Sequence, residues 1–144
     1  MRPAATIMLI IALTLLYTSC ETEARDKLKF TAPSGDTSTK AKRISLTDLR
    51  QSYKSLQGQQ VETEGVVWYQ FENVSICPSK NALSYEERKC FWLDFHNDLN
   101  LNDSLMQIAS GGHFIIRGTV DTSIAGHFGM YLGTIKDIYF MQEK

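Results

Sequence analysis

Two cysteines in the body of this chain are the residues whose chemistry is easiest to assign. Cys77 falls at the predicted end of one β-strand and Cys90 at the predicted start of the next. Facing positions on antiparallel strands lie about 4.5–5.5 Å apart, which suits a disulfide. A redox-active pair more often has Cys-x-x-Cys spacing, which is absent. We therefore predict a structural disulfide that closes a loop of 14 residues and stabilises the fold by about 3 kcal/mol.

Residues suited to catalysis or metal binding form no recognisable motif. His96-Asn97-Asp98 could supply metal ligands, but neither it nor His113 and His127 has the spacing of known histidine sites. Exposed histidines in loops or at strand ends are the simpler interpretation. Glu62 and Glu64 fit the solvent face of a strand, and nucleophile and phosphate-binding motifs are missing. The sequence thus predicts no enzyme activity, catalytic residue, metal or cofactor.

Aromatic residues are the feature with some potential for binding. Alternation along the strand predicted at 60–71 puts Trp68 opposite the core residues, beside Gln70 and Glu72. Trp92 lies on a nearby predicted strand. An exposed tryptophan among polar side chains can stack on a sugar ring or on a partner's side chain. Core packing, or cover by an N-terminal helix, is the competing interpretation. The candidate ligand-binding residues are Trp68, Gln70, Glu72 and Trp92.

The elements that would position these residues are five short strands. They are predicted at 60–71, 73–77, 91–95, 113–121 and 128–141. Gly65 and Gly118 interrupt the first and fourth of them, where a glycine predicts a bulge or a bend. The apolar phase of the fifth strand shifts across Lys136-Asp137. In the first strand, one predicted face consists of Val61, Thr63, Val67, Tyr69 and Phe71.

Two short helices complete the predicted body. The first begins at Ser45, carries apolar residues at helical spacing, and is ended by Gln57-Gly58. The second covers 102–110, between the third and fourth strands, and is stopped by Gly111-Gly112.

The order of three strands, a helix and two strands resembles the OB-fold, a five-stranded partly open barrel. The resemblance covers about residues 58–142 and implies ligand contacts on the outer face of strands one to three and in the loop 122–127. A lipocalin-like or sandwich arrangement is the alternative. The segment from Phe71 to Lys80 also resembles part of uncharacterised small envelope lipoproteins of bacteria, which implies no activity.

The N-terminus has the features of an export signal. Arg2 precedes an apolar run over 4–17, which is too short for a membrane-spanning helix of roughly 20 residues. Thr18-Ser19-Cys20 then resembles the lipobox of bacterial lipoproteins, which implies that Cys20 becomes a lipidated first residue. Tyr17 departs from that pattern, because leucine is commonest there. The alternative is an ordinary signal peptide cut near Ser19, leaving Cys20 as a free thiol.

The polar composition of 21–43 predicts a flexible linker. The expected organisation is therefore a signal peptide at 1–19, lipidated Cys20 with its linker at 20–44, and a barrel domain at 45–144. The charge differs between the last two parts, with a side-chain net of +2 in 20–44 and −4 in 45–144. The basic linker could attract anionic headgroups, although a solvated spacer is simpler.

These observations together predict a membrane-anchored lipoprotein of the bacterial cell envelope that faces the periplasm or the exterior. Its acidic domain argues against nucleic acid, whose binding depends on neutralising phosphates. The expected function is non-catalytic binding of a protein or glycan partner. The alternative is a periplasmic module that binds a small molecule or an oligosaccharide.

Overall fold

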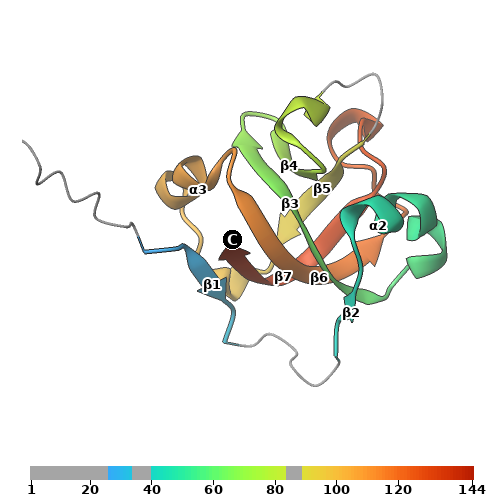
Figure 1. Cartoon of the computed structure of the whole chain (residues 1–144), viewed down its shortest axis with the longest axis horizontal. Helices are drawn as coiled ribbons and strands as arrows, with labels where there is room; N and C mark the ends of the chain where they lie inside the picture. Colours follow the sequence, from blue (N-terminus) through green and yellow to red (C-terminus); the bar gives the residue numbers. More distant parts are fainter. Residues whose placement is uncertain (1–25, 34–39, 84–88) are drawn as a thin grey trace, which may run out of the picture.

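The computed structural model describes residues 26–33, 40–83 and 89–144, so the predicted signal peptide and Cys20 lie outside the described residues. The described chain is mainly β structure with a few short helices (Figure 1). Five strands form a barrel: β3 (Gln60–Gln70), β4 (Asn73–Cys77), β5 (Phe91–Phe95), β6 (His113–Asp121) and β7 (Thr134–Glu143). The predicted bounds of β4, β5 and β6 are confirmed.

Strand pairing closes the barrel completely. β3 pairs with β4, and β4 with β5, in antiparallel register. β5 pairs with β7 in parallel, and β6 then pairs antiparallel with both β7 and β3. This circuit leaves no gap between the first and last strands, which confirms a mainly β, five-stranded barrel. Alternate side chains point inward, and the largest fully buried ones include Phe91, Phe114, Ile76, Ile116 and Met141.

Short helices cover parts of the barrel. Helix α2 (Leu46–Ser52) begins after Ser45, whose side chain accepts a hydrogen bond from the amide of Asp48. Leu46 and Leu49 of α2 are buried, and the 3-10 helix η2 (Tyr53–Leu56) follows. Helix α3 (Asp103–Ala109) lies between β5 and β6 in the chain. Among the described residues, no helix has the length and apolar character that crossing a membrane requires.

The two strand glycines have different roles from the bulges expected of them. β3 keeps one register with β6 straight through Gly65, so of the predicted bulge or bend at Gly65 the bulge is absent. A Cβ there would lie only 2.7 Å from the Cys77 carbonyl oxygen, so the strand needs glycine for close approach. At Gly118 the irregularity belongs to the neighbouring β7, where Asp137 has φ 49° and the register shifts. The predicted phase shift across Lys136-Asp137 is confirmed.

The loop between β6 and β7 is longer than expected. The fifth strand begins at Thr134 and not at 128, because Gly126, Phe128 and Gly129 have positive φ values that a strand does not allow. The short 3-10 helix η6 (His127–Gly129) lies in this loop. Phe71, assigned from the sequence to a core face, is instead 92% exposed in the β3–β4 turn, where Glu72 has φ 59°.

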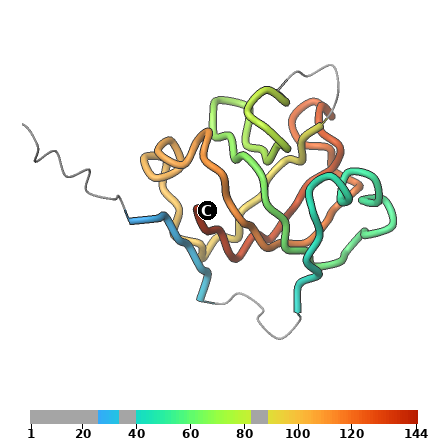
Figure 2. Tube along the Cα trace, viewed as in Figure 1, coloured from blue at the N-terminus to red at the C-terminus, as the bar shows by residue number. Residues whose placement is uncertain are grey.

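Two further strands occupy part of the range 20–44, for which the sequence predicts a flexible linker. β1 (Lys29–Thr31) pairs antiparallel with the end of β7, and β2 (Lys42–Arg43) pairs in parallel with the start of β3. The N-terminal segment therefore lies beside the last strand (Figure 2). Backbone pairing explains the difference, since each short strand completes a sheet edge that β5 or β4 leaves uncovered.

Candidate functional site

The structure brings together the two tryptophans proposed from the sequence as ligand-binding residues. Trp68 of β3 pairs with Ser75 of β4, and Ser75 pairs with Trp92 of β5. Residues paired in this way point to the same side of a sheet. Trp68 and Trp92 therefore share the outer face of these three strands, which is the face predicted for Trp68.

The predicted disulfide lies on this same face. Cys77 and Cys90 are bonded, with their Cα atoms 4.5 Å apart, and this confirms the prediction. Both cysteines are buried in a small apolar group outside the barrel core, which we call the disulfide cluster. Its members are Cys77, Ala82, Cys90 and Tyr131, with Trp68, Trp92 and Met130 packed against them.

The β6–β7 loop covers the face that the tryptophans share. The ring of Tyr131 packs edge-on against Trp92 with centroids 5.2 Å apart, and its hydroxyl donates to Asn73 Oδ1 at 3.0 Å. Gly126 approaches Trp92 so closely that a Cβ would lie 2.8 Å from that side chain. Trp68 is half-buried, and its Nε1 is inaccessible and has no hydrogen-bond partner among the described residues. Neither indole presents the open stacking face that the sequence suggested.

The remaining two candidates, Gln70 and Glu72, are exposed at the end of β3 and in the turn after it. Glu72 Oε2 lies 3.5 Å from His127 Nε2, a separation longer than a good hydrogen bond. This contact, with the Tyr131–Asn73 hydrogen bond, holds the β6–β7 loop beside the β3–β4 turn.

An exposed phenylalanine is the sequence neighbour of each residue in that contact. Phe71 is 92% exposed and Phe128 is 82% exposed. The centroids of the Phe128 and His127 rings lie 4.0 Å apart. We call Phe71, Glu72, His127 and Phe128 the loop-tip surface. Sequence reasoning missed both phenylalanines because it assigned them to strands. The glycines at 126 and 129, on either side of Phe128, are the signal that could have identified a loop.

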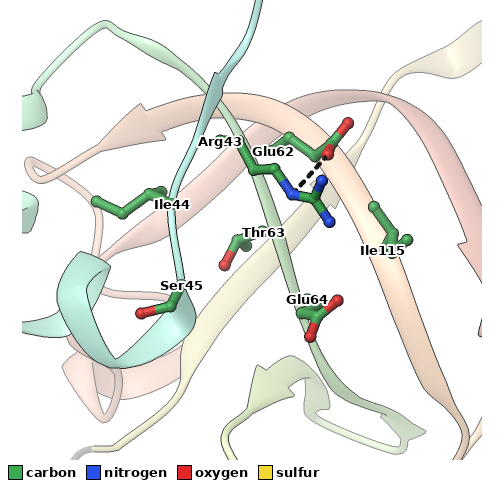
Figure 3. Close-up of a pocket in the computed structure, with 7 residues that line it drawn as sticks. All are labelled: Arg43, Ile44, Ser45, Glu62, Thr63, Glu64 and Ile115. Atoms are coloured by element: carbon green, nitrogen blue, oxygen red, sulfur yellow. Dashed lines mark ion pairs between the residues drawn. The ribbon is translucent and has the colours of Figure 1, made fainter.

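A pocket of about 160 Å³ opens on β3, beside the junction of β2 and α2 (Figure 3). Glu62 lies 2.7 Å from Arg117 Nε and 3.6 Å from Arg43 Nε. Lys144 Nζ lies 2.6 Å from Glu64 Oε2, and this hydrogen bond lowers the pKa of Glu64. Thr63 Oγ1 is buried here without a hydrogen-bond partner among the described residues. The two carboxylates are thus committed to ion pairs and are poorly placed to act as acid or base.

A second pocket, of about 270 Å³, lies between β3, the end of β5 and the start of α3. The Tyr69 hydroxyl donates to Asp103 Oδ1 at 2.6 Å, and this hydrogen bond raises the pKa of Tyr69. His96 also lines this pocket, and its Nδ1 accepts a hydrogen bond from the Asp98 amide.

The histidines are not gathered into one site. His96 follows β5, His113 begins β6 and His127 lies in the β6–β7 loop. Within the ranges that the structure describes, no three His, Cys, Asp or Glu side chains are placed to hold a metal ion. Comparison of the chain with protein-family models, curated proteins and solved structures found no match.

Proposed function

We propose that this chain is a lipid-anchored protein of the bacterial cell envelope whose barrel binds a protein partner through the loop-tip surface. The barrel is taken as OB-like, with α3 as the helix between its third and fourth strands and α2 as the short N-terminal helix. The order of elements and the parallel β5–β7 pair support this assignment.

The observation that carries the proposal is the pair of exposed phenylalanines, Phe71 and Phe128, on adjoining loops. Burying one phenylalanine in an apolar site gains about 1.5–3 kcal/mol, and aromatic side chains are over-represented in protein interfaces. Phe128 also has φ 51°, a conformation that costs an ordinary L-residue roughly 1–2 kcal/mol. Such local strain at an exposed aromatic residue is typical of binding sites.

The cover over Trp68 and Trp92 favours a protein partner over a glycan. A sugar ring needs an open aromatic face flanked by polar groups, and Tyr131 and Gly126 pack against Trp92 instead. An oligosaccharide could stack on these indoles only if the β6–β7 loop moved. Phe71 and Phe128 are better suited to insertion into an apolar groove on a folded protein.

The leader supports the lipid anchor, through the short apolar run and the small residues before Cys20. Several acyl chains on one cysteine give stable attachment, whereas a single chain is marginal. Growth with radiolabelled palmitate and mass analysis of the N-terminal peptide test this directly. We expect an acylated Cys20 in the membrane fraction, and no label in a Cys20→Ser chain. An unmodified Cys20 in the native chain would contradict the anchor.

Photo-crosslinking tests the partner. A benzophenone analogue of phenylalanine is introduced at 71 or 128, and, as a matched control, at Ile108, which is 54% exposed on α3. We expect a discrete protein adduct in whole cells from positions 71 and 128, and none from position 108. The same adduct should be lost when the other phenylalanine is replaced by serine. Equal adducts from all three positions, or none from any, would reject the loop-tip surface as the binding site.

A further inference from the structure

The N-terminal strands build a charged face on the barrel, and this inference about its ligand rests on the proposed lipid anchor. The face comprises β1 and β2 with the parts of β3, β6 and β7 that form a continuous ladder between them. We call it the basic face, made of residues 26–31, 40–43, 62–64, 113–117 and 140–144. We propose that the basic face lies against an anionic lipid bilayer and fixes the orientation of the barrel on the membrane.

The length of chain before the barrel supports this arrangement. β1 is paired with β7 and begins at Lys29, so only eight residues separate this strand from Cys20. The nine residue steps from Cys20 to Lys29 extend to at most about 30 Å. An acylated Cys20 would therefore hold β1 within a short distance of the headgroups. A free linker reaching to residue 44 would have imposed no such orientation.

Charge is divided between this face and the rest of the described chain. The basic face carries seven Lys and Arg side chains against four Asp and Glu, a net of +3. The other described residues carry five against seven, a net of −2. An anionic bilayer surface attracts the first region and repels the second, and both effects fall off within about 8 Å at physiological salt.

Several of these cations are free to meet lipid phosphates. Lys27, Lys29 and Lys40 are exposed, and none of them forms an ion pair with another described residue. Lys42 pairs with the buried Val61 and therefore points to the other side of the sheet. Lys29 and Arg117 both lie over the Phe140 ring, at 5.9 and 4.3 Å from its centroid. Arg43 and Arg117 share the single carboxylate of Glu62. These three side chains together therefore carry one uncompensated positive charge.

This orientation is compatible with partner binding. In the barrel circuit, β3 separates β6 from β4, and β7 separates β6 from β5. The outer face of β6 therefore lies across the barrel from β4 and β5, whose outer face carries the loop that bears Phe128. A membrane on the basic face would leave the loop-tip surface accessible from the aqueous side.

Lysine footprinting of the acylated chain tests the orientation without any substitution. The protein, as isolated from membranes, is placed in vesicles of phosphatidylcholine alone or with 30 mol% phosphatidylglycerol, then labelled with an amine-reactive ester. We expect Lys27, Lys29 and Lys40 to lose most of their labelling in the anionic vesicles only. Lys54 and Lys80, exposed elsewhere, serve as internal controls. Equal labelling of all five lysines in both vesicle types would overturn the proposal.

A second measurement separates this face from the anchor. A Cys20→Ser chain is tested for co-sedimentation with the anionic vesicles, alone and with Lys27, Lys29 and Lys40 all replaced by glutamine. We expect weak binding that disappears in 0.5 M salt, and about a hundredfold loss in the triple variant, from roughly fivefold per lysine. A Lys54→Gln/Lys80→Gln chain should bind unchanged. Unacylated Cys20 in the native protein would reject the anchor alone, whereas absence of vesicle binding by the Cys20→Ser chain would reject the basic face.

Discussion

At the scale of single residues, Phe128 has a backbone conformation that usually belongs to glycine or asparagine. Its φ is 51°, and the φ values of the nearby Gly126 and Gly129 are also positive. The side chain is 82% exposed, so few contacts in the folded barrel compensate for the backbone cost. The side chain is therefore better explained by contact with a partner than by stability.

Replacing Phe128 by asparagine separates these two contributions. Asparagine tolerates positive φ, so we expect the free energy of unfolding in urea to stay the same or rise by up to about 1 kcal/mol. Partner crosslinking from position 71 should fall at the same time. Phe128→Ala, which has no side-chain amide to hydrogen-bond the local backbone in this conformation, is the control and should show no gain in stability. A variant Phe128→Asn clearly less stable than the native chain would show that the ring supports the fold.

Asp121 gives a prediction about pH. Its side chain is 4% exposed and lies 2.8 Å from Lys136 Nζ, and it also accepts hydrogen bonds from the Ser123 amide and hydroxyl. The hydrogen bond from Lys136, followed by those from Ser123, lowers the pKa of Asp121 far below its usual range. A carboxyl with a depressed folded-state pKa stabilises the protein above its unfolded pKa of about 3.9, and this contribution is lost as pH falls further.

We therefore expect Asp121→Asn to lower the free energy of unfolding at pH 7 by about 1–2 kcal/mol. The difference from the native chain should narrow as the pH is lowered below about 4. Denaturant titrations from pH 2 to pH 7 measure both trends. Asp26→Asn, at an exposed carboxylate before β1, is the control and should have little effect. A difference for Asp121→Asn that stayed constant across this pH range would contradict the role of its charge.

At the scale of elements, the disulfide closes the β4–β5 connection and packs beneath the loop that covers Trp92. Cys77 and Cys90 lie in the same cluster as Tyr131, so the bridge stabilises the support beneath the loop-tip surface. Replacing both cysteines by serine should cost about 3 kcal/mol, from the entropy of an open loop in the unfolded chain. Urea unfolding of the two proteins under oxidising conditions measures the difference. Equal midpoints with equal slopes would show that packing alone holds this region.

The local sequence was sufficient to predict the strands whose pattern of apolar residues reflects burial. β4, β5 and β6 follow from runs of β-branched and aromatic residues bounded by turn residues, and the disulfide follows from where those strands end. The start of β7 was misplaced because an apolar run continues through Phe128 to Leu132, while the glycines at 126 and 129 turn the backbone. β1 and β2 have no local signal, since their partners far along the chain supply the hydrogen bonds.

The site was harder to predict than the fold. Alternation correctly placed Trp68 on the outer face, but it assigned no face to Trp92, and no pattern in the sequence shows that the β6–β7 loop folds over this face. That cover depends on tertiary contacts, the Tyr131–Asn73 hydrogen bond and the Gly126–Trp92 packing. Phe71 continued the alternation of β3, so its exposure could be seen only once Glu72 was known to turn the chain.

At the scale of the whole molecule, the N-terminal segment is joined to the same hydrogen-bonded system as the barrel. The Ala32 amide donates to the Tyr139 carbonyl at 2.8 Å, and the Ile44 amide donates to the Glu62 carbonyl at 3.0 Å. Ala32 is itself buried. These contacts link a stretch that composition alone assigns to a linker with both the first and the last strand of the barrel.

Hydrogen exchange in the native state tests whether that link holds in solution. An amide that can exchange only when part of the folded structure opens does so far more slowly than an amide in a flexible tail. We expect the Ala32 and Ile44 amides to exchange at least about a hundredfold more slowly than unstructured peptide, since a linkage of about 3 kcal/mol gives that protection. The exposed Ser123 amide, bonded only to the side chain of Asp121, is a comparison for a locally held loop. Exchange of Ala32 at the rate of free peptide would make β1 a loose tether. The free chain between Cys20 and the barrel would then be longer, and it would no longer hold the basic face toward the membrane.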